Sequence, residues 1–226
     1  TVYGATWTTN GISGGAYSFD GADDYINAGD VLGILGTGKT YSCWVKPSSV
    51  SSARGILNKN PVDPWSGVCV HANPDAGCTI YVNGATESSG GSVPSVFATA
   101  TWVHVVWVLE SNSTVSMYKN GVRRTLNNGG TYNAPSENGE PLVIGRAPTS
   151  PSSLRYYHGL IDEVRIYSRP LTETEVGMLY RSTFVGAGAS NGQMCVEILI
   201  EMTGETTIRH LIRQGDVDMG VYTNGP

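Results

Sequence analysis

Three observations predict that the chain is an all-β protein, built as an antiparallel sandwich of two sheets. Short runs of β-type residues recur along the chain, and Asn-Gly, Gly-Gly or Pro separates them. Hydrophobic residues make up 40% of the 226 residues and charged residues only 15%, which is ample for a globular core. One segment, near 172–181, carries convincing helix signals. Together these features favour one large β domain with a smaller appendage.

The predicted strands follow one another closely. Two of them end in the same pattern, Tyr-x-Asn-Gly, at residues 81–84 and 118–121. Asn-Gly supplies the positive φ angles that a tight hairpin turn requires, so we expect turns there and no chemistry. In order, the predicted strands are AYSF, DYINAG, TYSCWVKP, RGILNK, GVCVHA, CTIYVNG, TWVHVVWVLE, TVSMYKNG, PLVIGR and LIDEVRIY.

The short helix is predicted from its first turn. Thr172 can cap the N-terminus while Glu175 reaches back to the Thr172 amide, as in the T-x-x-E capping box. The macrodipole favours Glu173 in the same turn, so the two glutamates need no general acid–base role. The buried stripe of the helix would consist of Val176, Leu179 and Tyr180.

The chain divides into three parts. Residues 1–185 form the predicted sandwich domain, GAGASNGQ at 186–193 is typical of a flexible linker, and residues 194–226 form a small C-terminal β extension. Apolar residues alternate in MCVEILIEM and again in TTIRHLIRQ. Two or three strands are too few to be stable alone. The ribbon must therefore dock on the first domain or pair with a neighbouring subunit, and we favour an oligomerisation segment at 194–222.

The charge balance excludes two classes of partner. The net charge is −5 and the pI is about 5.3, and the lysines and arginines form no cluster. We therefore expect neither a nucleic acid nor an anionic membrane as partner. Apolar runs such as WVHVVWVL are too short to span a bilayer. Because the sequence has no initiator Met and no signal-like segment, we expect a processed or excised form.

The cysteines leave two interpretations open. Cys69 and Cys78 flank VHANPDAG, which is typical of a hairpin turn, so they could form a disulfide across it. Alternatively they are two buried thiols, a role that suits a small apolar side chain. Cys43 alternates with Tyr41 and Val45 and is expected in the core.

One carboxylate stands out in the last predicted strand. Regular alternation in LIDEVRIY places Asp162 on the same side as Val164 and Ile166. An unpaired carboxylate facing a core costs several kcal/mol, so Asp162 needs either a cation or several hydrogen-bond donors. Both alternatives remain open from the sequence.

The segment GILGTGKT matches the phosphate-loop pattern G-x-x-x-x-G-K-[ST] letter for letter over residues 33–40. That motif works only when a helix follows it and points its N-terminus at the phosphates. Here YSCWVKPSSV follows, which is typical of a strand and a turn. We therefore expect a surface loop and no nucleotide.

Four blocks of the sequence resemble laminin-G-like domains of the concanavalin A-like lectin/glucanase superfamily. FDGADDY at 19–25 is similar to the opening signature of that family, and YSCWVKP to its next strand. TWVHVVWVLESNSTVSMYKNGV resembles its central hairpin, and GLIDEVRIYSRPLTETEV its closing strand and helix. The resemblance covers roughly residues 1–180 and implies an antiparallel two-sheet jelly roll. The residues from about 187 onward lie outside it.

The resemblance also implies a structural calcium ion where the opening and closing strands meet. Calcium takes six to eight oxygen ligands, carboxylates and backbone carbonyls together. Asp162 would then be joined by Asp20 and the Gly21 carbonyl from the opening block, with Asp30 as a further ligand. Without the metal, Asp162 would accept backbone N–H bonds and fix a loop.

The sequence argues against an enzyme. Glucanases on this scaffold carry acidic residues two apart on one strand, whereas this chain has no E-x-D-x-E. Asp162 and Glu163 are adjacent, so on a strand they face opposite ways. There is no G-x-S-x-G, and the four histidines lack paired ligand spacing. His104, which alternates with Trp102 and Val106, is expected to be structural.

The loop NKNPVDPWSG is the predicted ligand contact. Trp65 lies off any core alternation, and its indole could stack on a sugar ring while Asp63 and Asn60 bind hydroxyls. The alternative is that Trp65 caps the edge of the core.

From the resemblance we expect a non-catalytic, lectin-like surface module, extracellular or displayed on a cell or virion. The alternating C-terminal ribbon favours a place within a multi-subunit assembly. The alternatives are a structural protein of a virion, tail or filament without a glycan ligand and, last, a glycan-active enzyme.

Overall fold

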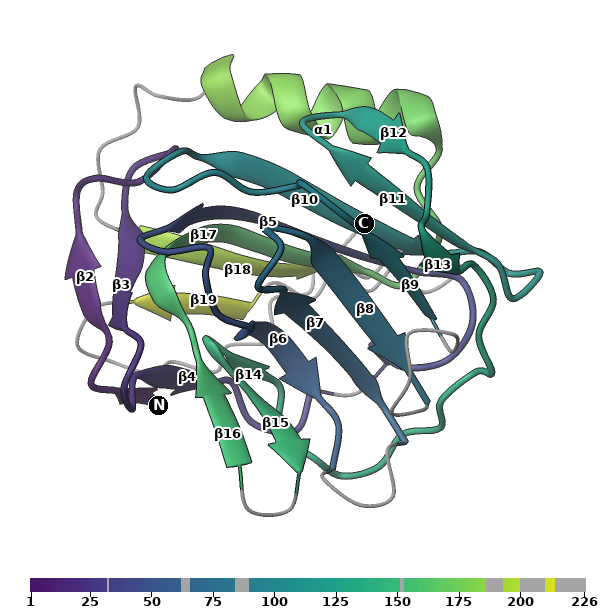
Figure 1. Cartoon of the computed structure of the whole chain (residues 1–226), viewed down its shortest axis with the longest axis horizontal. Helices are drawn as coiled ribbons and strands as arrows, with labels where there is room; N and C mark the ends of the chain where they lie inside the picture. Colours follow the sequence, from purple (N-terminus) through teal and green to yellow (C-terminus); the bar gives the residue numbers. More distant parts are fainter. Residues whose placement is uncertain are drawn as a thin grey trace, which may run out of the picture.

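The part of the chain that the structure describes forms a two-layer β sandwich with one helix on its outside (Figure 1). The computed structural model describes residues 1–31, 33–61, 66–83, 90–150, 153–185, 193–199 and 210–213. One sheet has eight strands in the order β1-β4-β14-β6-β7-β8-β9-β13. The other has nine strands, seven in the order β12-β11-β10-β5-β17-β18-β19, with β3 on β17 and β2 on β3. The predicted all-β, antiparallel, two-sheet jelly roll is confirmed.

The bounds of the elements follow the predicted runs closely in the main domain. The elements are β1 Val2–Tyr3, β2 Thr6–Thr8, β3 Ala16–Asp20, β4 Tyr25–Asn27, β5 Lys39–Pro47, β6 Arg54–Lys59, β7 Val68–Ala72, β8 Cys78–Val82, β9 Gly90–Val93, β10 Val103–Leu109, β11 Val115–Lys119, β12 Val122–Arg124, β13 Asn128–Gly129, β14 Val143–Ile144, β15 Arg146–Ser150, β16 Ser153–Tyr156, β17 His158–Tyr167, α1 Glu173–Val185, β18 Gln193–Leu199 and β19 His210–Arg213.

The core lies between the two sheets and is built by strict alternation in the central strands. In β8, Ile80 and Val82 are fully buried in the core, whereas Thr79 and Tyr81 face the other way. Trp107 of β10 is 1% exposed and donates its indole N–H to Cys78 Sγ at 3.3 Å. The Trp107 indole therefore joins the sheets and leaves no orphaned donor.

Helix α1 covers the outer face of the nine-stranded sheet (Figure 1). Tyr180 stacks on Trp44 with ring centroids 5.5 Å apart, and His104 lies 5.1 Å from Trp44. Burial lowers the pKa of His104 to about 3, so this histidine is a neutral part of the packing. A smaller apolar cluster continues beneath the helix with Val106, Val108, Tyr118, Tyr167, Leu171, Val176 and Leu179.

The predicted capping box is present at the start of α1. The Thr172 amide donates to Glu175 Oε2 at 2.8 Å, and the Glu175 amide donates to Thr172 Oγ1 at 3.3 Å. Arg169 adds two N–H donors to the same carboxylate, at 3.0 and 2.7 Å. The helix begins at Glu173, one residue after the cap, as the sequence predicts.

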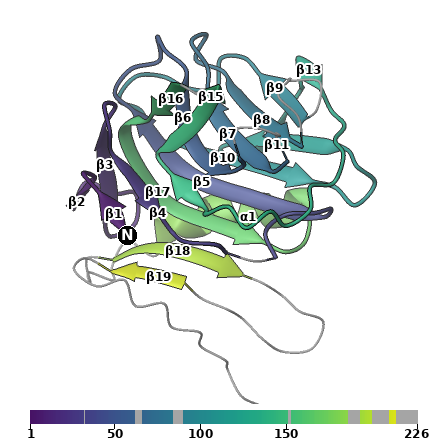
Figure 2. The ribbon, with the colours of Figure 1, turned by 90° about the horizontal axis from the view of Figure 1, so that it is seen from below.

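The C-terminal ribbon extends the nine-stranded sheet (Figure 2). Strand β18 pairs in parallel with the second half of β17, where Ile166 lies opposite Ile198, and β19 pairs antiparallel with β18. This pairing lies within one chain. Whether the same segment also joins a neighbouring subunit stays a prediction.

Within the described ranges, no helix is long and apolar enough to cross a bilayer.

A β-bulge in β17 reverses one prediction about side-chain direction. Asp162 pairs with Trp44 and Arg165 with Ser42, so two residues of β17 lie opposite Cys43 alone. Glu163 has φ of +47° at this point. The extra residue puts Ile161 and Val164 both in the core, and Asp162 faces outward with Trp44. The predicted shared side for Asp162 and Val164 is therefore wrong.

Candidate functional site

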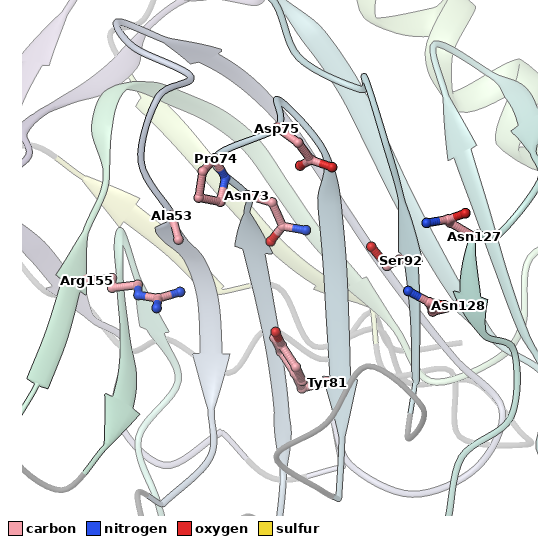
Figure 3. A pocket seen from close by; sticks show the side chains of 9 residues that line it. All are labelled: Ala53, Asn73, Pro74, Asp75, Tyr81, Ser92, Asn127, Asn128 and Arg155. Carbon is pink, nitrogen blue, oxygen red and sulfur yellow. The ribbon is translucent and has the colours of Figure 1, made fainter.

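The outward face of the eight-stranded sheet, which we call the open face, carries a polar groove. The β15–β16 hairpin lies across this face, where a Cβ on Gly55 of β6 would fall 2.2 Å from the Ala147 amide. The hairpin forms one side of the groove, and outward residues of β8 and β9 form its floor. The groove has a volume of about 390 Å³. It is lined by Ala53, Asn73, Pro74, Asp75, Tyr81, Ser92, Asn127, Asn128 and Arg155 (Figure 3).

Hydrogen bonds between side chains fix part of the groove floor. Asn73 Nδ2 donates to Thr79 Oγ1 at 2.7 Å, and Thr79 Oγ1 donates to Ser92 Oγ at 3.1 Å. Thr79 and Ser92 are buried opposite each other on β8 and β9. The Asn127 amide donates to the Ser92 carbonyl at 2.7 Å, which holds the Asn127–Asn128 segment at the rim with exposed side chains. The groove thus offers preorganised amide and hydroxyl groups.

Beneath the hairpin, the floor is neutral. His71 Nε2 and Cys69 Sγ of β7 lie 3.0 Å apart, both buried, and the His71 ring contacts Tyr81 at a centroid distance of 5.3 Å. Burial, with Arg155 nearby, lowers the pKa of His71 to about 3. Burial also raises the pKa of the Cys69 thiol. Neither side chain is charged near neutral pH, so this pair is no activated nucleophile and base.

Two charged side chains line the groove. Arg155 of β16 reaches over it from the hairpin side, and Asp75 lies at its end in the β7–β8 turn (Figure 3). Asp75 Oδ1 accepts the Gly77 amide at 2.9 Å, so the turn fixes its carboxylate. An isolated carboxylate, an arginine and several amides suit hydrogen bonding to a hydroxyl-rich ligand.

The Asp162 carboxylate binds backbone donors. It accepts the Ile12 amide at 2.8 Å, the Ser13 amide at 3.2 Å and its neighbour Glu163's amide at 2.8 Å. Asp162 is fully buried, and this burial outweighs the three donors and raises its pKa to about 7. Asp162 therefore fixes the loop that precedes β3, which is the metal-free alternative of the sequence analysis.

The predicted calcium ligands do not form one cluster. His158 pairs with Asp20, so Asp162 lies four residues, or about 13 Å, further along β17. Asp30 accepts Lys59 Nζ at 2.5 Å. The Gly21 carbonyl accepts an N–H of Arg54 at 3.2 Å, so a guanidinium already lies where a metal ion would have to bind this oxygen. Lys59 thus binds Asp30 and backbone amides bind Asp162, so neither carboxylate joins a common metal site with Asp20.

Three acidic side chains do meet in the turn between β3 and β4. Ligand oxygens of Asp20, Asp23 and Asp24 lie within 4.8 Å of one another. Asp20 accepts the Ala22 amide at 2.7 Å, which lowers its pKa, and Asp24 accepts the Asp20 amide at 2.9 Å. Burial, followed by repulsion from the other two carboxylates, raises the pKa of Asp24. Asp20 is the one predicted ligand that belongs to this cluster.

The predicted sugar loop is placed only in part. Trp65 and Asp63 lie outside the described residues. Asn60 is 5% exposed, and its carbonyl accepts an N–H of Asn58 at 3.3 Å. A buried Asn60 side chain cannot present its amide to a ligand at the surface, so Asn60 belongs to the structural framework of the loop.

The proposed disulfide between Cys69 and Cys78 is wrong. Both are free thiols, and Cys69 lies opposite Tyr81 while Cys78 lies opposite Ala72. Tyr81, the residue opposite Cys69, lies three positions from Cys78 along β8, an odd number that places the two cysteines on opposite faces of the hairpin. Cys69 is on the open face, whereas Cys78 is in the core.

The false phosphate loop binds a carboxylate of its own chain. Glu137 Oε1 accepts the amides of Gly33 and Leu35 at 3.0 and 3.2 Å. Thr40 Oγ1 donates to the Arg169 carbonyl and accepts the Leu171 amide, which ties β5 to the segment before α1. These two loop amides thus bind an internal carboxylate, as expected for a structural loop.

The groove is not among the sites predicted from the sequence, although the sequence carries a signal for it. Thr79 and Tyr81 alternate with Ile80 and Val82, a pattern typical of a strand with one polar face. The positions of Arg155 and Asn127 could not be predicted, because they reach the groove through a hairpin and a loop far away in sequence.

Comparison with known proteins supports the fold. A family model described as the concanavalin A-like lectin/glucanases superfamily matches residues 20–177. No curated protein sequence matches the chain. Domain 4 of AbnA, an extracellular arabinanase from Geobacillus stearothermophilus solved with arabinotriose, is 20% identical at a TM-score of 0.59 and covers 79% of this chain and 82% of its own.

Two further solved structures share the architecture. The heptameric SAP-like pentraxin from Limulus polyphemus is 15% identical at a TM-score of 0.58, with 91% of this chain and 92% of the pentraxin chain covered. The binding domain of botulinum neurotoxin serotype D is 14% identical at a TM-score of 0.54, with 80% and 46% covered. At these identities the likeness establishes a common fold.

Proposed function

The chain belongs to the concanavalin A-like lectin/glucanases superfamily, and on this basis we propose that it is a non-catalytic glycan-binding module. The observation that carries the proposal is the polar groove on the open face. Its lining combines amide, hydroxyl, carboxylate and guanidinium groups, and the hydrogen bonds of Thr79 to Asn73 and Ser92 fix part of its floor. Such groups bind sugar hydroxyls, and the Tyr81 ring adds an apolar surface.

A binding role fits the groove better than catalysis does. Glycosidases of the usual kind flank the scissile bond with two carboxyl groups. Among the described residues that line this groove, Asp75 is the only acidic one. A single carboxylate can orient a hydroxyl group, but it cannot serve as both nucleophile and acid. We place the module outside the cell, as the similar domain of the arabinanase is part of an extracellular enzyme.

A glycan array tests the proposal directly. The wild-type protein should bind a subset of glycans, and Asn127→Ala should weaken that binding, because the exposed Asn127 side chain lies at the rim. Asn10→Ala is the matched control, since Asn10 is also exposed but lies in the loop after β2. Absence of glycan binding by the wild type, or equal losses in the two variants, would refute the groove as a glycan site.

The C-terminal ribbon supports a second proposal, that the module associates with a neighbouring subunit. In the described part of the chain, β19 is an edge strand of its sheet, and an edge strand is a template for pairing with another chain. Size-exclusion chromatography with light scattering should show an oligomer for the full chain and a monomer after removal of 194–222. A full-length monomer would contradict this proposal.

A further inference from the structure

We propose that the groove selects acidic glycans, with Arg155 binding the carboxylate of a uronate or similar sugar. This inference rests on the proposed glycan-binding function and names the ligand class of the same groove. Arg155 is partly buried in the β15–β16 hairpin, where its cross-strand neighbour is Ala147. Figure 3 shows its guanidinium on the hairpin side of the groove.

Arg155 has no hydrogen-bond or ion-pair partner among the described residues, unlike several other cations that are at least partly buried. Lys59 pairs with Asp30, and Arg169 pairs with Glu175. Arg54 donates to two backbone carbonyls. A guanidinium held at the wall of a groove without such a partner leaves its donors available to a ligand.

The surroundings of Arg155 leave its charge uncompensated. The side chains beneath it, His71 and Cys69, are neutral at neutral pH, as the shifts of their pKa values show. The carboxylate that lines the groove, Asp75, forms no ion pair with Arg155, and its Oδ1 accepts the Gly77 amide. A ligand carboxylate bound to Arg155 would compensate its positive charge.

The two ends of the groove match the two ends of an acidic sugar. Arg155 presents planar, paired N–H donors, which suit a carboxylate better than a hydroxyl group. Asp75 and Asn127, away from the hairpin, offer acceptors and donors for hydroxyl groups (Figure 3). An acidic sugar would therefore bind in one orientation, with its carboxylate toward the hairpin.

The test uses an array of matched pairs, each an acidic oligosaccharide and its methyl ester, which differ only in the charge of the carboxylate. The wild type should prefer the acids about 10- to 100-fold, as expected for hydrogen bonds to a charged group. Arg155→Gln should lose this preference while still binding the esters. Arg124→Gln, which removes the same charge on exposed β12, should keep it.

The outcomes separate the inference from the proposed function. If acids and esters bind equally to the wild type, or if Arg155→Gln keeps the preference, acid selection by Arg155 is refuted while glycan binding stands. If no acid, no ester and no neutral glycan binds, the proposed function fails and the inference fails with it. Circular dichroism on each variant shows whether a loss of binding reflects unfolding.

Discussion

At the scale of single residues, Asp162 shows how one extra residue in a strand changes the role of a side chain. Because of the bulge, Asp162 does not share the core side of Val164 but faces the loop before β3. The Ile12 and Ser13 amides of that loop and the neighbouring Glu163 amide donate to its carboxylate. Those donors satisfy the carboxylate without a metal ion. Asp162, the acidic residue that stands out in the sequence, therefore fixes the loop before β3 through hydrogen bonds. The polar groove lies on the other sheet.

Substitution of Asp162 should change both stability and its pH dependence. Asp162→Ala leaves the partly buried Ile12 and Ser13 amides without this acceptor and should cost about 1 kcal/mol for each, the low end of the range for an unpaired donor. The native pKa of about 7 exceeds the ordinary value of 3.8, so the native state binds more protons between these values. Its contribution to the free energy of unfolding therefore falls as pH rises from about 4 to 7.

Asp162→Asn should remove this part of the pH dependence. The measurement is urea unfolding from pH 4 to 8 for the wild type, Asp162→Asn and the exposed control Asn10→Ala, which removes no titratable group. The difference between the wild type and Asp162→Asn should vary across pH 4 to 7, whereas the difference from the control should not. A constant difference for both variants would show that Asp162 does not titrate in this range.

Much of the residue-scale prediction failed because it depended on contacts distant in sequence. Alternation correctly predicts Cys43 and Val45 in the core, since a strand's period is local information. The partner of Asp30 and the position of Arg155 are not local, because Lys59 reaches Asp30, and the β15–β16 hairpin brings Arg155 to the groove, from elsewhere in the chain. No pattern within either segment reveals them.

At the scale of elements, the cap of α1 links a sequence motif to a measurable pH effect. Hydrogen bonds from Arg169 and then Thr172 lower the pKa of Glu175 from 4.5 to about 2. Ionised Glu175 therefore stabilises the fold above about pH 4.5, and this contribution is lost as pH falls toward 2. Glu175→Gln should flatten the acid side of the stability profile.

The check is the melting temperature of the wild type and Glu175→Gln between pH 2 and 6. The two curves should converge as the pH falls, because protonated Glu175 loses the same ion pair that the variant lacks. Thr172→Ala, which removes the cap, should cost about 1 kcal/mol at neutral pH. Parallel melting curves across the whole pH range would contradict the role given to Glu175.

Elements with their own turn or cap signals are predicted well, and elements without them are not. The capping box and the Asn120-Gly121 turn each fix a local geometry that is visible in a few residues. The β15–β16 hairpin, which forms the wall of the groove, has no such signal, because its apolar contacts with β6 depend on the approach of Gly55 and Ala147. The wall of the groove was therefore missed.

At the scale of the whole molecule, a structural cation remains a proposal, now at the turn between β3 and β4. Asp20, Asp23 and Asp24 bring three carboxylates together, and a calcium ion would offset their mutual repulsion. Exhaustive chelation should lower the melting temperature, and added calcium should restore it. Asp23→Asn should weaken this response, whereas Asp162→Asn should retain it, because Asp162 lies apart from the turn.

An unchanged melting curve after chelation would refute the calcium proposal.

The sandwich itself is predictable because its strands are short, frequent and alternating, and four sequence blocks resemble one family. The place of the groove on the eight-stranded sheet is harder to predict, because it depends on the order of the strands within the sheets. Whole-molecule function therefore depends on a surface that no single segment encodes.

The most direct test of the central claim is a two-dimensional NMR titration with a glycan selected from the array. If the groove on the open face is the binding site, the largest shifts should fall on the amides of Asn73, Tyr81, Ser92, Asn127 and Arg155. The turn at 111–114, which lies outside the groove, should not respond. Shifts centred on that turn or on the β3–β4 turn, with the groove amides unchanged, would contradict this account.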